Sequence, residues 1–471
     1  MQNTKKYYLV LALLMSILAL ENCKKEPIPV APVDKLPSGT TQIVASPQRT
    51  NGDVAAGYDY LINGNYLSSG IPLGIFKSVF GANSPDDLNR TGDAKGIAAS
   101  YNVVSAANGV KIVAPNCLSC HSDKLNGQLI VGLGNTTTDN TNDASGQVNA
   151  VELLINLKHG ANSPEMKAFQ AFARGSRAVA PFIKTDVQGV SPADKIFAVL
   201  AAHRKTSDLT WIDKATSNIP TTVIPTDIPA WWLLKKKNAL YYNALGVGDM
   251  SRTIMSAAML TLIDSTEARS IEPNFVNVLA YIKNLKAPKY PKSTDAKLVA
   301  DGQTIFVNNC AKCHGNYSTN TYPNLLVDLP TIGTDKALAE EYGNYPEYNN
   351  WFNKSWFGAG KYSSQLNPTK GYLAPPLDGI WATAPYLHNG SVPTLEDLLN
   401  SKQRPAMWSR TFDNSDYNDI KVGWNYTVET SKVDAKTYNT AAYGYSNTGH
   451  TYGDFLTVTE RKALIEYLKT L

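Results

Sequence analysis

Apolar side chains recur at helical spacing in two stretches that lie far apart in the chain. The last stretch has the i, i+3, i+4, i+7 pattern of an amphipathic helix, carried by Leu464, Tyr467, Leu468 and Leu471. Thr457 followed by Glu460 gives this helix a capping-box start. The earlier stretch has a similar apolar face, formed by Phe275, Val278, Leu279, Ile282 and Leu285. Two helices are therefore predicted, one near the middle of the chain and one at its end.

The ends of these two stretches repeat one another. Residues 281–285 and 467–471 share the order Tyr, aliphatic, Lys, polar, Leu. Between them, Pro288 and Pro291 interrupt any helix and mark a boundary. An internal repeat of this kind indicates two comparable units in series, which we place at residues 51–290 and 291–471.

The two units begin differently. In the second, Leu298, Gly302, Ile305 and Phe306 fall on one face of a predicted helix. Glycine on that face permits close approach of another helix, for which the C-terminal one is the candidate. In the first, residues 102–104 and 110–113 flank an Asn-Gly pair and predict a short hairpin. The remaining loops are long and rich in Gly, Asn, Pro and Tyr, so the fold class expected is mainly α with long ordered loops.

Composition limits the classes of function. Of 471 residues, 43% are hydrophobic and 18% are charged, which is typical of a globular protein with a full core. The net charge of +4 comes from 44 basic and 40 acidic side chains spread along the chain. No basic stripe indicates a nucleic-acid partner.

The first residues predict export. Lys5 and Lys6 precede an uncharged stretch at residues 7–20, shorter than the roughly 20 residues of a membrane span. Residues 1–22 are therefore predicted to be a signal peptide. Leu20 and Cys23 resemble a bacterial lipobox, although Glu21 and Asn22 depart from its small residues.

Two interpretations of this region stay open. In one, Cys23 is acylated and residues 23–50, rich in proline, form a linker from a lipid anchor in the membrane to the folded body. In the other, the signal is cleaved conventionally and Cys23 is incidental. Both predict a periplasmic or cell-surface protein.

The other four cysteines carry the strongest chemical signal. They form two Cys-x-x-Cys-His motifs: Cys117, Cys120 and His121, and then Cys310, Cys313 and His314. Two thiols on a helical turn reach the vinyl groups of a porphyrin, and the adjacent imidazole ligates the iron. A zinc site built from both pairs, or a redox-active dithiol, would not explain the histidine after each pair. We predict two covalently bound haem c groups, one in each of two tandem cytochrome c-like domains.

The occupant of the sixth iron position decides the function. The histidines outside the motifs are His159, His203, His388 and His450. His388 lies in a Pro-Tyr-Leu-His-Asn-Gly turn that we expect to border a cofactor. His450 lies between glycines, which let the backbone approach a porphyrin edge. Both are candidate iron ligands, and Met407 is an outside candidate.

At these residues the chain resembles the dihaem cytochrome c peroxidase superfamily, and within it the dihaem rubber oxygenases and their relatives. The likeness extends from about residue 50 to the end. It is carried by residues 116–121, 132–135, 228–232 with Lys235, Lys236 and Lys237, 332–335 and, most distinctively, 375–390.

The resemblance implies different roles for the two haems. The N-terminal haem, on His121, would be the reactive one, with its other face open to an oxidant. The C-terminal haem, on His314, would relay electrons, and the rubber oxygenases favour His450 over His388 as its distal ligand. The family also places a tryptophan between the haems, which matches Trp231 or Trp232, although a large core ring is the alternative interpretation of both.

Further site residues are candidates only. Arg252 is a candidate partner for a haem propionate. The three adjacent lysines are candidates too, although such a run is more often a solvated face. Calcium is a further candidate cofactor, and no motif in the sequence locates a site for it.

Three functions remain open. The first is a dihaem oxidoreductase that uses peroxide or another oxidant, with a redox protein as donor or acceptor. The second is an oxygenase that cleaves an apolar molecule with O2, and the third is a cytochrome of pure electron transfer. Asp249 is the first acidic residue after Trp232, so it is the candidate acid–base group there. Its small and apolar surroundings favour dioxygen or an apolar substrate over efficient peroxide turnover.

Overall fold

The computed structural model of the protein describes residues 36–471. The predicted signal peptide and the acylation site at Cys23 lie outside these residues and stay predictions. The end of the predicted linker belongs to the folded body, because Thr40–Gln42 pairs as a strand with Leu325–Asp328. Within the described part of the chain, no helix combines the length and apolar character needed to cross a membrane.

The helices account for 39% of the described residues. The α-helices are α2 (Val54–Asn63), α3 (Leu73–Phe80), α4 (Leu118–His121), α5 (Ser145–His159), α6 (Pro164–Val179), α7 (Ala193–Ala202), α8 (Met250–Met255), α9 (Ser265–Asn284), α10 (Ala296–Asn309), α11 (Ala311–His314), α12 (Leu329–Ile332), α13 (Ala337–Asn344), α14 (Glu347–Lys354), α15 (Leu395–Leu398) and α16 (Val458–Leu468). A 3-10 helix, η4 (Trp231–Lys236), carries the two adjacent tryptophans.

The strands account for 13% and form small antiparallel sheets. They are β1 (Thr40–Gln42), β8 (Leu325–Asp328) and β10 (Gly371–Leu373) in one sheet, β2 (Ile71–Pro72), β4 (Lys111–Pro115) and β3 (Tyr101–Ser105) in a second, and β14 (Thr427–Val428), β11 (Met407–Ser409) and β15 (Thr437–Asn439) in a third. Two-stranded sheets pair β5 (Ser122–Leu125) with β6 (Gln128–Val131), β7 (Gly246–Gly248) with β9 (Ser364–Leu366), and β12 (Tyr417–Asn418) with β13 (Gly423–Trp424).

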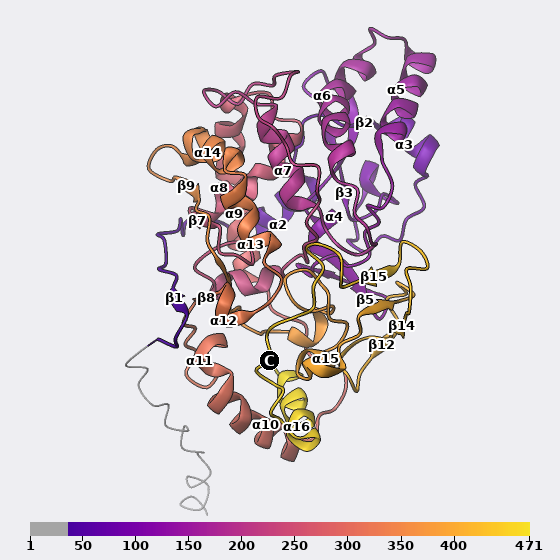
Figure 1. Ribbon diagram of the computed structural model, residues 1–471. Coiled ribbons are helices and arrows are strands. Elements are labelled where there is room, and N and C mark those ends of the chain that lie inside the picture. The colour runs from indigo at the N-terminus through magenta and orange to yellow at the C-terminus, as the bar shows by residue number, and fades with distance from the viewer. Residues whose placement is uncertain (1–35) are drawn as a thin grey trace, which may run out of the picture.

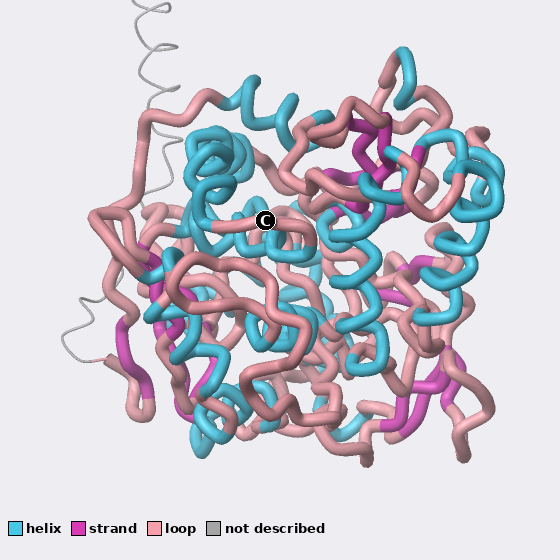
Figure 2. Tube along the Cα trace, turned by 90° about the horizontal axis from the view of Figure 1, so that it is seen from above, coloured by secondary structure: helices cyan, strands magenta, loops and turns pink. Residues whose placement is uncertain are grey.

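The fold is therefore mixed. The expectation of a mainly α protein is confirmed in part, because helices predominate but small sheets are also present. Figure 2 shows loops winding between the helices, with the strands in separate small groups. The strands are two to five residues long, too short for a period-two pattern to appear in the sequence. The predicted hairpin is confirmed, since β3 and β4 pair with Val103 opposite Val113.

The predicted C-terminal helix packs as the sequence indicates. In α16, the Thr457 side chain accepts from the Glu460 backbone N–H, and the Glu460 side chain accepts in return. An added Cβ at Gly302 of α10 would lie 2.0 Å from the Ala463 carbonyl oxygen of α16. Because glycine has no side chain at this position, α10 and α16 can lie in close contact. They cross at the lower end of the molecule (Figure 1).

A second helix pair has the same arrangement. Gly57 of α2 lies against α9, and an added Cβ there would lie 2.0 Å from the Asn277 carbonyl oxygen. The repeated tyrosines also correspond: the Tyr281 ring lies 5.1 Å from that of Tyr58, and the Tyr467 ring lies 5.2 Å from that of Phe306. Each half of the chain therefore contains a glycine-bearing helix crossed by a helix that ends in the repeated motif.

Packing crosses the predicted boundary at residue 290. One large core contains side chains of α2, α7 and α9 together with Ala337, Tyr348, Phe357 and Tyr372 from the second unit. A second core, around Phe306 and α16, includes Leu125 from the first unit. The two predicted units are therefore interleaved: α13, α14 and β10 contribute side chains to the core of the N-terminal half.

Candidate haem sites

Both Cys-x-x-Cys-His motifs lie on a single helical turn. The His121 backbone N–H donates to the Cys117 carbonyl at 2.9 Å in α4, and His314 donates to Cys310 at 3.0 Å in α11. A turn of this kind places both thiols and the imidazole beside one ligand, as the spacing predicts.

The competing interpretations of the cysteines find no support. All four are free thiols, and no group of three or more His, Cys, Asp or Glu within residues 36–471 is placed to hold a metal ion. Burial raises the pKa of the Cys117 and Cys310 thiols to about 11, whereas a reactive dithiol needs a lowered pKa. Neither a shared zinc site nor a redox-active pair fits this environment.

The C-terminal motif borders a cavity of about 200 Å³. Its lining includes Cys310, Cys313, His314, His388 and His450. The Nδ1 atom of His314 lies 2.8 Å from the Pro375 carbonyl oxygen, so its protonated form donates there and leaves Nε2 free for a metal. The cavity therefore holds the thiols and imidazole that a covalently bound haem requires.

His450 faces His314 across this cavity. Their ring centroids are 6.2 Å apart. Two imidazoles that ligate one metal from opposite sides, each at a metal–nitrogen distance of about 2 Å, hold their centroids roughly 6 Å apart. The spacing of the two rings thus fits one iron between them.

The loop that carries His450 is fixed on both sides. The His450 backbone N–H donates to the Ile332 carbonyl at 2.8 Å, and φ at His450 is 45°. Gly449 lies so close to Gly333 that an added Cβ would be 2.2 Å from its carbonyl carbon. The Arg404 guanidinium donates to the carbonyls of Gly449 and His450 at 2.7 and 3.1 Å. The glycines beside His450 were expected to let the backbone approach a porphyrin edge. In the structure, Gly449 instead lies against the loop that contains Gly333.

His388 lines the same cavity but has a different neighbour. Its ring is stacked on Tyr372 with centroids 4.0 Å apart, and its Nε2 atom has no protein hydrogen-bond partner among the described residues. Burial lowers the pKa of both His388 and His450 to about 3, which keeps both imidazoles neutral. Met407 lies in β11 and does not line the cavity.

The two remaining histidines, His159 and His203, contact other side chains and backbone away from the two cavities. His159 ends α5 and lies 3.7 Å from the Glu165 carboxylate. His203 is stacked on Trp211, with its Nδ1 atom 2.9 Å from the Ile212 carbonyl oxygen. Neither lines a cavity beside a Cys-x-x-Cys-His motif.

The N-terminal motif borders a larger cavity of about 340 Å³, lined by Cys117, Cys120 and His121. The His121 ring is stacked on Trp231 at 4.4 Å, and its buried Nδ1 has no protein partner in the described chain. Burial lowers the His121 pKa to about 3, so the ring is neutral. Of the residues described, no second histidine and no methionine lines this cavity. The two sites therefore differ in the ligands they offer to an iron.

The tryptophans of η4 lie between the two sites. Trp231 lines the N-terminal cavity, and Trp232 is fully buried beside it. The Trp232 Nε1–H donates to the carbonyl of Asp378 at 2.7 Å, and Asp378 lines the C-terminal cavity. Trp231 thus borders the N-terminal cavity and Trp232 contacts a residue of the C-terminal one, while a role for either ring between two cofactors stays a prediction.

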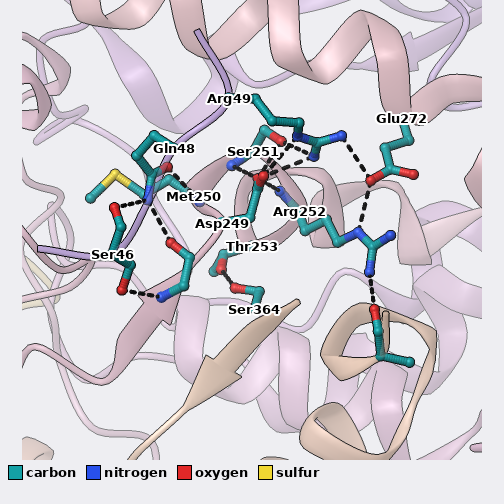
Figure 3. A network of polar contacts seen from close by, with 12 residues as sticks. Ser46, Gln48, Arg49, Asp249, Met250, Ser251, Arg252, Thr253, Glu272 and Ser364 are labelled. Atoms are coloured by element: carbon teal, nitrogen blue, oxygen red, sulfur yellow. Dashed lines mark hydrogen bonds and ion pairs between the residues drawn. The ribbon is translucent and has the colours of Figure 1, made fainter. Parts of the chain in front are cut away.

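Asp249 and Arg252 have structural roles instead of the predicted ones. The Asp249 carboxylate caps α8 by accepting from the Ser251 and Arg252 backbone, and it forms an ion pair with Arg49 at 2.7 Å (Figure 3). Arg252 forms an ion pair with Glu272 at 2.8 Å (Figure 3). Neither residue lines a cavity that borders a Cys-x-x-Cys-His motif, so the structure does not support the acid–base and propionate assignments. Arg49, which engages Asp249, comes from the predicted linker and could not be paired with it by sequence pattern.

Two aspartates that the sequence did not single out line the sites, together with Lys237, which is one of the three lysines named as candidate propionate partners. Asp194, in the first turn of α7, lines the N-terminal cavity. Burial raises the pKa of Asp194 and of Asp227 to about 7. Asp227 and Lys237 line both cavities, together with Pro229, Ala230 and Tyr242. Of these, Lys237 alone belongs to a run that stands out in the sequence.

Family models match the second half of the chain. The model described as cytochrome c matches residues 299–389, which include the second Cys-x-x-Cys-His motif and His388. The model described as RoxA-like, cytochrome c-like matches residues 371–409. These matches support a c-type cytochrome related to RoxA. The first match supports haem binding, electron transfer and covalently bound haem c for the domain at residues 299–389.

The chain is also similar to individual proteins, two of which are uncharacterized. The chain is 27% identical over 299 residues to the uncharacterized protein y4iM of Sinorhizobium fredii, covering 54% of this chain and 66% of that one. It is 30% identical over 254 residues to y4iJ of the same organism, covering 40% and 41% of the two chains. A stretch of 97 residues is 32% identical to the cbb3-type cytochrome c oxidase subunit CcoP of Cereibacter sphaeroides, covering 19% and 30%. The matched stretches cover less than two thirds of each relative.

Proposed function

We propose that this protein is an exported c-type cytochrome that carries two covalent haems and works as an oxidoreductase of the dihaem cytochrome c peroxidase superfamily. Cys117, Cys120 and His121 would hold the N-terminal haem, and Cys310, Cys313 and His314 the C-terminal one. The N-terminal haem would supply an iron centre that reacts with an oxidant, and the C-terminal haem would supply an electron relay.

One observation carries the proposal: the two cavities differ in the candidate iron ligands that line them. The C-terminal cavity presents His450 opposite His314, which favours an iron with both axial positions filled. The N-terminal cavity presents His121 without a second histidine or a methionine among its described lining residues, which favours an accessible iron. An accessible iron at the N-terminal site suits reaction with an oxidant. An iron with both positions filled at the C-terminal site suits electron transfer to it.

The helix pairs support the tandem arrangement. Gly57 against α9 and Gly302 against α16 give each half of the chain the same crossing of a first and last helix. Each crossing belongs to a half that carries one Cys-x-x-Cys-His turn. This correspondence supports two cytochrome c-like domains, even though their cores are interleaved.

The residues around the sites have roles that follow from their contacts. The Pro375 carbonyl orients the His314 ring, and the Trp231 ring holds that of His121 by stacking. The Trp231–Trp232 pair offers a path for an electron between the cavities. Asp194 is the better candidate than Asp249 for holding a proton beside the N-terminal site, because it lines that cavity.

An oxygenase that cleaves an apolar molecule with O2 is the second candidate. The N-terminal cavity is lined by apolar side chains such as Phe197, Leu200 and Leu245, which would suit an apolar substrate. Pure electron transfer, the third possibility, requires a second ligand at the N-terminal iron, and no histidine or methionine of the described cavity wall offers one.

Electron paramagnetic resonance of the ferric protein tests the proposal, after a pyridine haemochrome assay on denatured protein has counted the covalent haems. We expect two haems per chain, one high-spin and one low-spin. Two low-spin signals would leave electron transfer alone, and fewer than two covalent haems would overturn the proposal. Peroxide turnover with a reduced donor protein, set against O2 consumption with a long-chain unsaturated hydrocarbon, then separates the two enzymatic candidates.

Export and membrane attachment are tested separately. Fractionation of cells that express the full chain should place it in the periplasm or at the cell surface. Replacing Cys23 with Ser should release it from the membrane fraction if Cys23 is acylated. An unchanged distribution would favour the conventionally cleaved signal.

A further inference from the structure

Lys237 occupies a position unlike those of the two lysines that precede it. It follows η4 and exposes 6% of its surface, and it lines both the N-terminal and the C-terminal cavity. Lys235 is exposed, and Lys236 forms an ion pair with Asp378 at 2.6 Å. One member of this run is therefore buried in the wall that the two cavities share.

Lys237 forms no ion pair in the described protein. Its Nζ atom donates to the Tyr241 carbonyl at 3.5 Å. Burial, with no charged neighbour to oppose it, lowers its pKa to about 8. A buried ammonium without a counter-ion is costly, because it loses hydration that no carboxylate replaces.

The carboxylate that shares this wall is already engaged. Asp227 also lines both cavities, but its Oδ2 atom accepts a hydrogen bond from the Tyr242 hydroxyl. No ion pair joins Asp227 to Lys237 within the described chain. The described side chains therefore leave the place of a counter-ion to Lys237 open to an acidic group that binds in the two cavities.

We propose that Lys237 binds propionate carboxylates of both haems from the shared wall, and so acts as a common internal counter-ion for the two sites. The inference rests on the proposed function, since it needs a haem in each cavity. A haem brings carboxylates as its ionised groups, and a charge-assisted hydrogen bond to an ammonium satisfies both partners. A positive charge at this place stabilises the reduced state of each neighbouring iron.

The test compares variants of the full-length protein loaded with haem. In Lys237→Met the charge is lost, in Lys237→Arg it is kept, and Lys235→Met removes an exposed charge from the same run. The pyridine haemochrome assay first counts the haems of each variant. Fewer than two in the wild type would overturn the proposed function itself, which separates that failure from a failure of the present inference.

Spectroelectrochemical titration then measures the midpoint potential of each haem. We expect both potentials to fall in Lys237→Met, by more than any change in Lys235→Met, and to stay near the wild-type values in Lys237→Arg. Unchanged potentials would overturn the inference, and a fall in one haem alone would overturn the shared role. If Lys237→Met loads haem poorly, Lys237→Gln carries the same expectation with a polar side chain of similar length.

Discussion

The imidazole rings of His314 and His450 face each other at 6.2 Å between centroids, although 136 positions separate the two residues in the chain (450 minus 314). His314 is fixed by the turn of α11 and by the Pro375 carbonyl. His450 is fixed by Ile332 and by the Arg404 guanidinium. The ring of His314 and the backbone of His450 are thus held by contacts within the protein, which would reduce the cost of ordering the two imidazoles around a metal.

Replacing His450 with Ala is expected to convert the proposed C-terminal haem from low spin to high spin, because the imidazole that would ligate the iron opposite His314 is removed. His388→Ala is the matched control, since His388 lines the same cavity but stacks on Tyr372. Paramagnetic resonance and visible spectra of the ferric variants measure the change. A low-spin signal that survives in His450→Ala and disappears in His388→Ala would reverse the assignment.

Replacing Arg404 with Met should loosen the His450 loop. The Arg404 side chain donates to five backbone carbonyls, those of Asp397, Leu398, Asn447, Gly449 and His450. Loss of bonds from a charged donor costs about 1.5–3 kcal/mol for each bond that is not replaced by water. We expect a lower free energy of unfolding and a mixture of high-spin and low-spin signals at the C-terminal haem. Lys402→Met, an exposed change nearby, should show neither effect.

Replacing Gly302 with Ala tests the packing of α10 on α16. The added Cβ would lie 2.0 Å from the Ala463 carbonyl oxygen, a backbone atom that moves only with its helix. Overpacking of this kind costs about 1–3 kcal/mol, measured as a drop in the free energy of unfolding in urea. Gly146→Ala is the control: nothing lies within 4 Å of its added Cβ, so stability should stay unchanged or rise slightly. Equal stabilities of the two variants would contradict the close contact.

The sequence predicted those features that depend on local pattern. The capping box at Thr457 and Glu460, the hairpin around residues 108–109 and the two helical Cys-x-x-Cys-His turns are all confirmed. Each is specified by residues a few positions apart, so neighbouring side chains and backbone determine it. The contact of Gly302 with α16 was also predicted, because a glycine on an apolar helix face is typical of a close helix crossing.

The sequence could not predict partners that come from distant parts of the chain. Asp249 was assigned to the site because it is acidic and follows the tryptophans, but Arg49, 200 positions away, engages it elsewhere. Lys237 was a candidate propionate partner within a run that is more typical of a solvated face, and its burial, which depends on both cavity walls, could not be predicted. The strands of two or three residues, such as β1 and β7, exist because a remote strand supplies hydrogen bonds. Such long-range pairing leaves no periodic trace in the sequence.

Replacing Asp194 with Asn should change how stability depends on pH. Burial raises the pKa of Asp194 to about 7, against the lowering field of Lys195, whereas an unfolded aspartate titrates near about 3.9. Between these values the folded state binds the extra proton, so the free energy of unfolding falls as pH rises, by about 1.4 kcal/mol per pH unit for one such group. The variant loses this term, so its stability should fall less steeply from pH 5 to pH 7 and exceed that of the wild type at pH 8. Asp227, whose pKa is raised in the same direction, keeps its contribution in both proteins. Urea unfolding at these three pH values measures the slopes, and parallel curves for the two proteins would show that Asp194 is ionised throughout.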